Sequence, residues 1–343
     1  MDPIPFSGSP GSPYTRKMLA VLRYRRLPYR FISGDASRFG FPAPKVRLLP
    51  TFYFPDANGE FQAVTDSSPI LRKLDHDYPG RSVIPDSPAL AFLDHLVEDY
   101  ADEWLTKAMF HYRWSYAADI RKSATVLPNW MGRPLSEGDL ESLGKAFSQR
   151  QIGRLSYVGS NPVTGPVIEA SYQRLLHILE THLAEAAFVF GARPGAADFG
   201  LFGQLTQLAA FDPTPTALAE RIAPRVIAYV GQIEDLSGLE PTPSDWSDPD
   251  RLSPSQCALL GEIGRVYAPL LLANAEAVRS GAGRVEAEIE GALWTQNPFP
   301  YQVKCLNWLR EAYGKLAPDA QRTVAKALDG TGCDTLFAGH ESA

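Results

Sequence analysis

Residues 4–32 determine the architecture of the amino-terminal region, and they read IPFSGSPGSPYTRKMLAVLRYRRLPYRFI. An apolar run at 4–7 leads into a turn rich in glycine and proline, and residues 14–26 then repeat apolar side chains with a helical period. Leu27-Pro28 ends that helix, because proline cannot continue a helix and biases the preceding residue towards extended geometry. Residues 29–32 return to a strand pattern. The stretch therefore predicts a β-α-β unit.

The segment that follows extends this unit into a small α/β domain. Strands are predicted at 51–54 and 60–64, and the turn between them ends in Asn58-Gly59, a strong hairpin signal because both residues tolerate positive φ. Ser67-Ser68-Pro69 then opens a helix over 70–78, since serine caps helices and proline is tolerated in the first turn. We expect residues 1–82 to form a domain with a mixed four-stranded sheet.

Beyond a proline-rich linker at 85–88 the pattern becomes helical. Amphipathic segments are predicted at 90–109, 167–183, 196–208, 217–233, 253–280, 301–313 and 318–328. No stretch alternates with period two for long, so residues 89–343 are expected to form an all-α domain that includes an extension over 251–343. An aromatic segment at 294–301 is expected to pack back on the body of this domain; the alternative is a roof over a substrate site.

Composition excludes several classes of protein. A chain of 343 residues suits two domains if one domain has about 150 residues. A net charge of −6 argues against a protein that coats nucleic acid, and no apolar run is long enough to cross a membrane. The chain starts without a signal peptide, and three cysteines are too few for a disulfide framework. A cytoplasmic protein without nucleic-acid or membrane partners is expected. Six scattered histidines predict no metal site.

Charge is unevenly distributed along the chain. Residues 1–50 contain nine basic and two acidic side chains, whereas the whole chain is acidic. A basic amino-terminal unit on an acidic body suits a small anionic ligand bound at that unit. The alternative interpretation is a solvated helix face followed by a basic loop.

Three separated features of the first domain carry the candidate chemistry. Ser12 stands where the first strand turns into the first helix, and a helix start offers free N–H groups and a partial positive charge to an anion. Leu49-Pro50 precedes a strand; a cis bond there would let Leu49 present its backbone to a peptide ligand. Asp66-Ser67 begins another helix, where donors can meet a carboxylate and Asp66 can face an ammonium group.

These motifs, in this order and spacing, resemble the glutathione transferase superfamily. Four segments carry the resemblance: Ser12-Pro13-Tyr14, Arg47-Leu48-Leu49-Pro50-Thr51-Phe52, Asp66-Ser67-Ser68-Pro69-Ile70-Leu71 and GARPGAADF at 191–199. The resemblance implies a thioredoxin-like amino-terminal domain followed by an all-α carboxy-terminal domain, and a homodimer.

The resemblance also implies roles for residues at the matching positions. Leu49 with cis-Pro50 would hold the cysteinyl backbone of glutathione, and Asp66 with Ser67 would hold its γ-glutamyl end. Ser12 would donate to the glutathione thiolate, as in serine-type members, because one hydrogen bond to a thiolate favours its charged form. The remaining candidates are Tyr14 and Thr15 as neighbouring donors, Lys45 and Arg47 for the glycyl carboxylate, and Tyr112, Arg113 and Tyr116 for the substrate pocket.

Two departures from the family pattern bear on function. Gly195 replaces the hydroxyl residue that normally caps the helix in the fourth segment, although Asp198 can still accept from a backbone N–H there. The chain also runs past the usual end of the family pattern, over the extension 251–343. Separately, no cysteine lies in residues 1–256, which excludes thioredoxin-type disulfide exchange. The resemblance therefore implies an enzyme that activates glutathione, as co-substrate and without a metal, for attack on a small apolar electrophile. The alternative is a non-catalytic binding or scaffold protein of the same fold.

Overall fold

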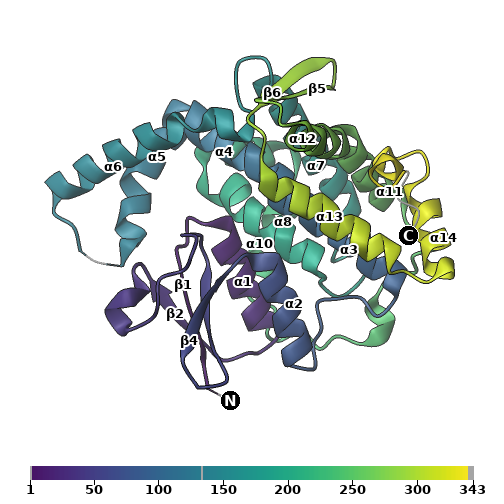
Figure 1. Ribbon diagram of the computed structural model, residues 1–343, viewed down its shortest axis with the longest axis horizontal. Coiled ribbons are helices and arrows are strands. Elements are labelled where there is room, and N and C mark those ends of the chain that lie inside the picture. Colours follow the sequence, from purple (N-terminus) through teal and green to yellow (C-terminus); the bar gives the residue numbers. More distant parts are fainter. Residues whose placement is uncertain (1, 133, 339–343) are drawn as a thin grey trace.

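The amino-terminal domain is built on a four-stranded mixed sheet. The computed structural model describes residues 2–132 and 134–338. The strands β1 (Ile4–Gly8), β2 (Tyr29–Ser33), β3 (Thr51–Pro55) and β4 (Phe61–Thr65) lie in the order β2-β1-β3-β4 (Figure 1). β1 runs parallel to β2 and antiparallel to β3, and β3 pairs antiparallel with β4. The predicted β-α-β unit and hairpin are confirmed.

Two helices cover one face of this sheet. α1 (Pro13–Tyr24) and α2 (Ser67–Asp77) pack their apolar sides on Phe6 and Phe52, which are both fully buried. The opposite face carries a smaller apolar cluster, in which the short helix η1 (Ala36–Phe39) and Phe41 lie against Ile32 and Tyr53. The larger cluster continues without interruption into the helical domain, so the two domains share one core.

A series of helices forms the middle of the chain. Its members are α3 (Pro88–Tyr100), the π-helical turn η2 (Ala101–Leu105), α4 (Thr106–Ser115), α5 (Ala117–Val126), η3 (Leu127–Met131), α6 (Glu137–Ile152), η4 (Leu155–Val158), α7 (Gly165–His182), α8 (Ala196–Thr206), η5 (Gln207–Phe211), α9 (Pro213–Ile222), α10 (Pro224–Ile233) and η6 (Pro243–Asp245). The single helix expected over 217–233 is two helices, because Pro224 cannot continue the first and starts the second.

The central helix α8 positions α1. A Cβ on Gly203 of α8 would lie 2.6 Å from the carbonyl oxygen of Pro13, so only glycine allows the two helices to approach this closely. The start of α8 also explains the unusual Gly195. A Cβ there would lie 2.2 Å from Oδ1 of Asp94, whose carboxylate accepts a hydrogen bond from the Ala197 N–H at 3.1 Å. Asp94 of α3 thus takes the place of the missing capping hydroxyl, and Asp198 accepts from the Gly195 N–H at 2.9 Å.

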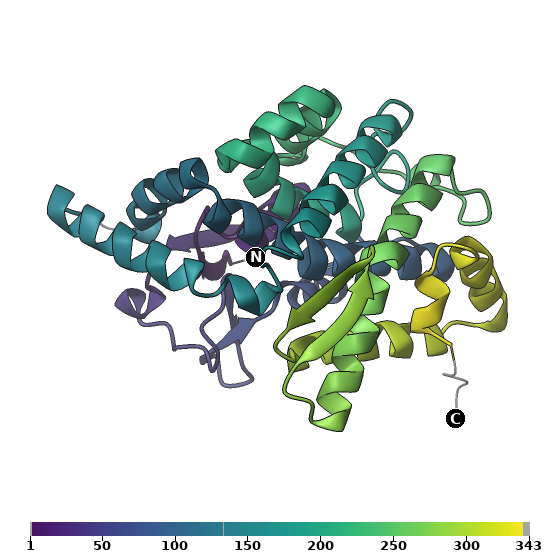
Figure 2. The ribbon, with the colours of Figure 1, turned by 90° about the horizontal axis from the view of Figure 1, so that it is seen from above.

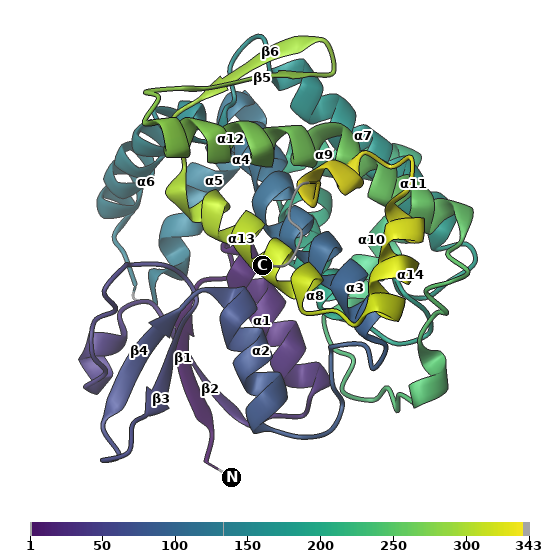
Figure 3. The same cartoon turned by 45° about the vertical axis from the view of Figure 1, so that its right-hand side comes forward.

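The extension adds a third layer to the molecule. It comprises α11 (Pro254–Glu262), the π-helical turn η7 (Ile263–Tyr267), α12 (Ala268–Ser280), β5 (Val285–Ile289), β6 (Ala292–Gln296), α13 (Pro300–Gly314), α14 (Pro318–Leu328) and η8 (Cys333–Leu336). α11 packs on α7, whereas α13 and α14 pack on α3 (Figure 3). Residues 339–343 of the predicted extension lie outside the described residues.

The β5–β6 hairpin corrects the expectation of an all-α carboxy-terminal domain. Its strands alternate buried and exposed side chains, and Glu290 and Gly291 turn the chain with φ values of 54° and 74°. Trp294 of β6 is fully buried, with its ring centroid 5.2 Å from that of Trp104. This part of the aromatic segment therefore packs on the body, as expected. Seen from above, the arm of α5 and α6 projects on the side opposite to the extension (Figure 2).

Candidate functional site

Ser12 occupies the N-cap position of α1. Its Oγ accepts a hydrogen bond from the Thr15 N–H at 3.3 Å and lies 3.5 Å from the carbonyl oxygen of Leu49, to which its hydroxyl can donate. Both distances are at the long end of the normal range, so the hydroxyl is only weakly bound. Because Ser12 is half-buried at the positive end of a helix, it can turn its O–H towards an anion without losing a strong contact.

Leu49 presents its backbone beside Ser12. The Leu49-Pro50 peptide bond is cis, as the resemblance implies, and the Leu49 residue is 44% exposed. Within residues 2–132 and 134–338, Ser12 is the one donor to its carbonyl oxygen, and its N–H has no acceptor. A free N–H, together with a C=O whose one described contact is the long one from Ser12, can pair with an extended peptide in the manner of an added strand.

Asp66 and Ser67 form the start of α2. Asp66 has a φ of 87°, a strained value for a residue with a side chain, and such strain often marks a binding site. Its side chain does not cap the helix; instead Oδ2 accepts a hydrogen bond at 2.7 Å from the hydroxyl of Tyr301, which belongs to the extension. Ser67 is 6% exposed in the first turn of the helix.

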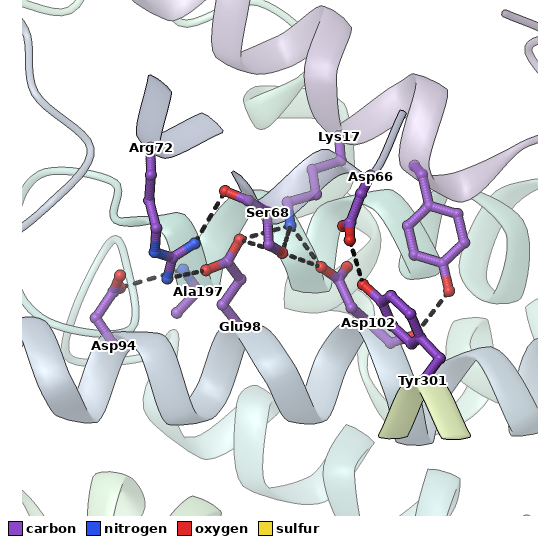
Figure 4. A network of polar contacts seen from close by, with 10 residues as sticks. Lys17, Asp66, Ser68, Arg72, Asp94, Glu98, Asp102, Ala197 and Tyr301 are labelled. Atoms are coloured by element: carbon purple, nitrogen blue, oxygen red, sulfur yellow. Dashed lines mark hydrogen bonds and ion pairs between the residues drawn. The ribbon is translucent and has the colours of Figure 1, made fainter. Parts of the chain in front are cut away.

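A buried ionic network fixes this helix start (Figure 4). Lys17 of α1 is fully buried and its Nζ lies 2.7 Å from Glu98, 2.5 Å from Asp102 and 3.3 Å from Ser68 Oγ. Arg72 of α2 lies 2.7 Å from the other oxygen of Glu98. Burial alone would lower the pKa of Lys17, but Asp102 and Glu98 raise it, so Lys17 stays charged. The two cations balance the two carboxylates and hold α1, α2 and α3 together.

The other two predicted donors are less available than Ser12, because the Tyr14 hydroxyl is bound and Thr15 is buried. The Tyr14 hydroxyl donates to the carbonyl oxygen of Asp102 at 2.8 Å, and burial raises the pKa of Tyr14 well above its usual range. Thr15 is fully buried, and its Oγ1 accepts from the Ser9 N–H at 3.3 Å. Ser12 is therefore the candidate hydroxyl that is most available to a ligand.

A large cavity opens next to Ser12. Its volume is about 1170 Å³, and its wall is mainly aromatic and aliphatic. The lining residues include Gly11, Ser12, Tyr14, Leu49, Met109, Phe110, Arg113, Trp114, Leu127, Pro128, Trp130, Leu143, Ala146, Phe147 and Arg150. Helices α4 and α6, with η3 between α5 and α6, supply half of the lining residues, and the amino-terminal domain supplies the other half. An apolar cavity next to Ser12 can bring an apolar molecule to a nucleophile held there.

The structure divides the three residues predicted for the substrate pocket. Arg113 borders the cavity, but its guanidinium is paired with Asp212 at 2.8 Å and donates to the Gly11 carbonyl at 3.2 Å, so it holds the loop before Ser12. Tyr112 and Tyr116 lie outside the lining residues among those described; their rings stack on each other 5.6 Å apart. Tyr112 of α4 and Tyr116, the residue directly after α4, lie on a different face from the lining residues Phe110 and Trp114.

Two family models match separate segments of the chain. Residues 6–82 match "Glutathione S-transferase, N-terminal domain" and residues 163–231 match "Glutathione S-transferase, C-terminal domain". The two segments together cover less than half of the chain, and the extension lies outside both of them.

Solved structures similar to this chain are distant in sequence. The β-etherase LigF of a Sphingobium strain is 16% identical, with 68% of this chain and 95% of that chain covered and a TM-score of 0.44. A glutathione S-transferase of Methylobacterium radiotolerans, solved with glutathione sulfonate, is 17% identical, with 68% and 91% covered and a TM-score of 0.40. Poplar glutathione transferase F1 is 16% identical, with 68% and 92% covered and a TM-score of 0.39. No curated protein matches the sequence.

The basic residues of the amino-terminal region largely serve its structure. Five of the nine basic residues in the first fifty pair with carboxylates: Arg16, Lys17, Arg23, Arg25 and Arg26. Lys45 and Arg47 are exposed on the loop before β3, and Arg47 borders the cavity. The surplus positive charge of this region is thus a smaller attraction for an anionic ligand than the sequence indicates.

Two further findings concern metals and membranes. Among the residues that the structure describes, no three His, Cys, Asp or Glu side chains are grouped as a metal site. In the same part of the chain, each helix is too short or too polar to span a bilayer.

Sequence reasoning missed two residues of the site. Lys17 stands in a basic helix and has the sequence context of a solvated charge, although it is buried. Tyr301 belongs to the aromatic segment expected to pack on the body, yet its hydroxyl contacts the proposed ligand residue Asp66. A partial signal for Lys17 is its place on the helical face of Pro13, Ala20 and Val21, which are all buried.

Proposed function

We propose that this protein is a glutathione-dependent transferase of the serine type that acts on a small apolar electrophile. The observation that carries the proposal is the position of Ser12, a weakly bound hydroxyl at a helix start between the free backbone of Leu49 and an apolar cavity. Glutathione is the second substrate in this proposal, and no step requires a metal.

The proposed glutathione groove runs from Ser12 past Leu49 to Asp66, and binding would use its whole length. The N–H and C=O of Leu49 pair with the cysteinyl backbone, and the Asp66 carboxylate accepts from the γ-glutamyl ammonium. Ser67 and the start of α2 hold the γ-glutamyl carboxylate, because a helix start offers N–H donors and a positive dipole. The exposed charges of Lys45 and Arg47 attract the glycyl carboxylate.

Catalysis would depend on the protonation state of the sulfur. The Ser12 O–H donates to the sulfur, which favours the thiolate and releases the thiol proton to solvent. The thiolate then forms a carbon–sulfur bond with an electrophile in the cavity, and the electron pair of the broken bond leaves with the leaving group. The task of the protein is to orient the two substrates and stabilise negative charge on the sulfur.

The proposal is tested by removing the hydroxyl without disturbing the helix. Ser12→Gly keeps most of the N-cap stability, because glycine costs only a few tenths of a kcal/mol at this position. We expect kcat for conjugation of glutathione to an activated aryl halide to fall about 10²-fold, the usual effect of losing one donor to a developing anion. The dissociation constant of glutathione, measured by calorimetry, should change little.

Ser12→Thr serves as the matched control. It restores a hydroxyl at the same position and should recover most of the rate. Equal rates for Ser12→Gly and the unaltered protein would contradict the assignment of Ser12.

A non-catalytic binding protein is the second candidate. The observation that favours it is the Tyr301–Asp66 hydrogen bond, which occupies part of the proposed ammonium site. Glutathione binding without any measurable conjugation by the unaltered protein would support this candidate. The family resemblance also favours a cytoplasmic homodimer, and sedimentation of the purified chain tests the dimer.

A further inference from the structure

Tyr301 links the extension to the proposed glutathione groove. It lies in the first turn of α13, and its hydroxyl donates to Oδ2 of Asp66 across 235 positions of sequence (Figure 4). Burial raises the pKa of Tyr301, and the Cys305 thiol and the Asp66 carboxylate raise it further. Tyr301 is therefore a protonated donor over the whole physiological range.

The chain around Tyr301 is fixed on both sides. Asn274 of α12 is fully buried, accepts from the Phe299 N–H at 2.8 Å and donates to the Phe299 carbonyl at 2.9 Å. Gln302, which is 1% exposed, donates to Glu103 at 3.1 Å. The ring of Trp308 stands edge-on to that of Tyr301, with centroids 6.2 Å apart. Tyr301 is thus held in place by contacts of its neighbours with both the extension and η2.

Asp66 keeps one oxygen for a ligand. Within residues 2–132 and 134–338, its carboxylate has no cationic partner, and Tyr301 is the one donor to it. The buried cation of the neighbouring ionic network, Lys17, is shared between Glu98 and Asp102. A half-buried carboxylate with one oxygen bound and the other free suits a primary ammonium group, because the charge of the ligand supplies the missing partner.

We propose that Tyr301 is a positioning residue that makes this groove selective for thiols with a free α-ammonium group at the γ-glutamyl end. The inference rests on the proposed function. Tyr301 fixes the Asp66 carboxylate so that its free oxygen faces the ammonium group, and the extension thereby completes a binding site built from the amino-terminal domain.

The test compares two ligands on two forms of the full chain. Tyr301→Phe removes the hydroxyl and keeps the ring. Calorimetry is carried out with glutathione and with its des-amino analogue, glutaryl-cysteinyl-glycine. We expect Tyr301→Phe to weaken the binding of glutathione ~3- to 10-fold, the usual effect of losing one hydrogen bond, and to leave the binding of the analogue unchanged.

Tyr313→Phe is the matched control on the same helix. The Tyr313 hydroxyl makes no hydrogen bond with the residues that the structure describes, and its ring stacks on Phe337 at 4.9 Å. The control variant should bind both ligands like the unaltered protein. Thermal unfolding of both variants shows whether α13 remains docked.

Each other outcome overturns the inference in a recognisable way. If Tyr301→Phe weakened the binding of both ligands equally, Tyr301 would have a purely structural role. Unchanged binding of glutathione would show that Tyr301 does not position Asp66. Tighter binding by Tyr301→Phe would mean that Tyr301 obstructs the groove. If the unaltered protein and both variants give no heat with glutathione, the proposed function fails and this inference fails with it.

Discussion

The two ends of the proposed groove are built in opposite ways. At the sulfur end, the Ser12 hydroxyl has only long contacts of 3.3 and 3.5 Å. At the ammonium end, Asp66 is bound by Tyr301 at 2.7 Å, and the adjoining start of α2 is held by the buried charge of Lys17. We infer from this contrast that Ser12 is left free to reorient because the charge on the sulfur changes during the reaction. Asp66, by contrast, is held rigidly because it orients the ligand.

The largest expected effect comes from removing the buried cation at the rigid end. Lys17→Met leaves Glu98 and Asp102 with less positive charge in a buried site, so we expect a loss of about 3–5 kcal/mol in the free energy of unfolding. Chemical denaturation measures it. Lys315→Met is the control, because Lys315 is 79% exposed and should contribute less than about 1 kcal/mol. A loss at Lys17 as small as that of the control would refute the rigid network.

A smaller effect is expected from displacing the adjustable end. Gly203→Ala places a Cβ 2.6 Å from the Pro13 carbonyl, so the start of α1 must move. We expect a loss of about 1–3 kcal/mol in stability and a lower kcat, because Ser12 moves with α1. Gly231→Ala is the control, since around Gly231 no described atom lies within 4 Å of the new Cβ. If Gly203→Ala matched the control in stability and rate, α8 would not position Ser12.

A third effect, at most about 1.4 kcal/mol per pH unit for each group, concerns the pH dependence of the rigid end, where the extension meets α3 and η2. Burial raises the pKa of Glu103 to about 8 and that of Asp99 to about 7, and these carboxyls accept from Gln302 and Tyr267 of the extension. The other ionisable groups around them are Asp102, Lys107, Tyr14, Tyr301 and Cys305. Burial lowers the pKa of Lys107 to about 8. Lys107 therefore keeps its proton between pH 5 and 7 and adds nothing to the change in stability over that range.

The sign of the pH effect follows from these shifts. Between pH 5 and 7 the unfolded chain has lost both protons, whereas the folded chain retains them, so stability falls as pH rises. Each carboxyl contributes up to about 1.4 kcal/mol per pH unit. Glu103→Gln should flatten this slope in denaturation curves measured across the range, and it should keep the hydrogen bond to Gln302 available. An unchanged slope in Glu103→Gln would show that Glu103 is already ionised when folded.

Local sequence signals predicted the amino-terminal domain well. Leu27-Pro28 is a strong signal for the end of a helix, and Asn58-Gly59 is a strong signal for a turn. The strands and helices around them lie within a few residues of their expected positions. The β5–β6 hairpin was missed for a physical reason. Glutamate and alanine favour helix, and the turn uses Glu290-Gly291, in which glutamate has less tolerance for positive φ than asparagine.

Only those parts of the candidate site that short sequence motifs form could be predicted. The helix starts at Ser12 and Asp66 are visible in short motifs. The contacts of Lys17 with Glu98 and of Tyr301 with Asp66 join residues 81 and 235 positions apart, and no local pattern encodes such pairs. The prediction of a pocket role for the tyrosines at 112 and 116 depends on their place in an aromatic helix, but the face that they occupy depends on how that helix packs.

Stabilisation of a glutathione thiolate by Ser12 underlies the whole proposal, and the ultraviolet thiolate absorbance of the glutathione complex reports it as a function of pH. We predict that the pKa of the bound thiol lies about one unit or more below that of a free thiol near 8.5, that Ser12→Thr keeps this shift, and that Ser12→Gly abolishes it. A bound thiol whose pKa is the same in the unaltered protein and in Ser12→Gly would contradict the claim.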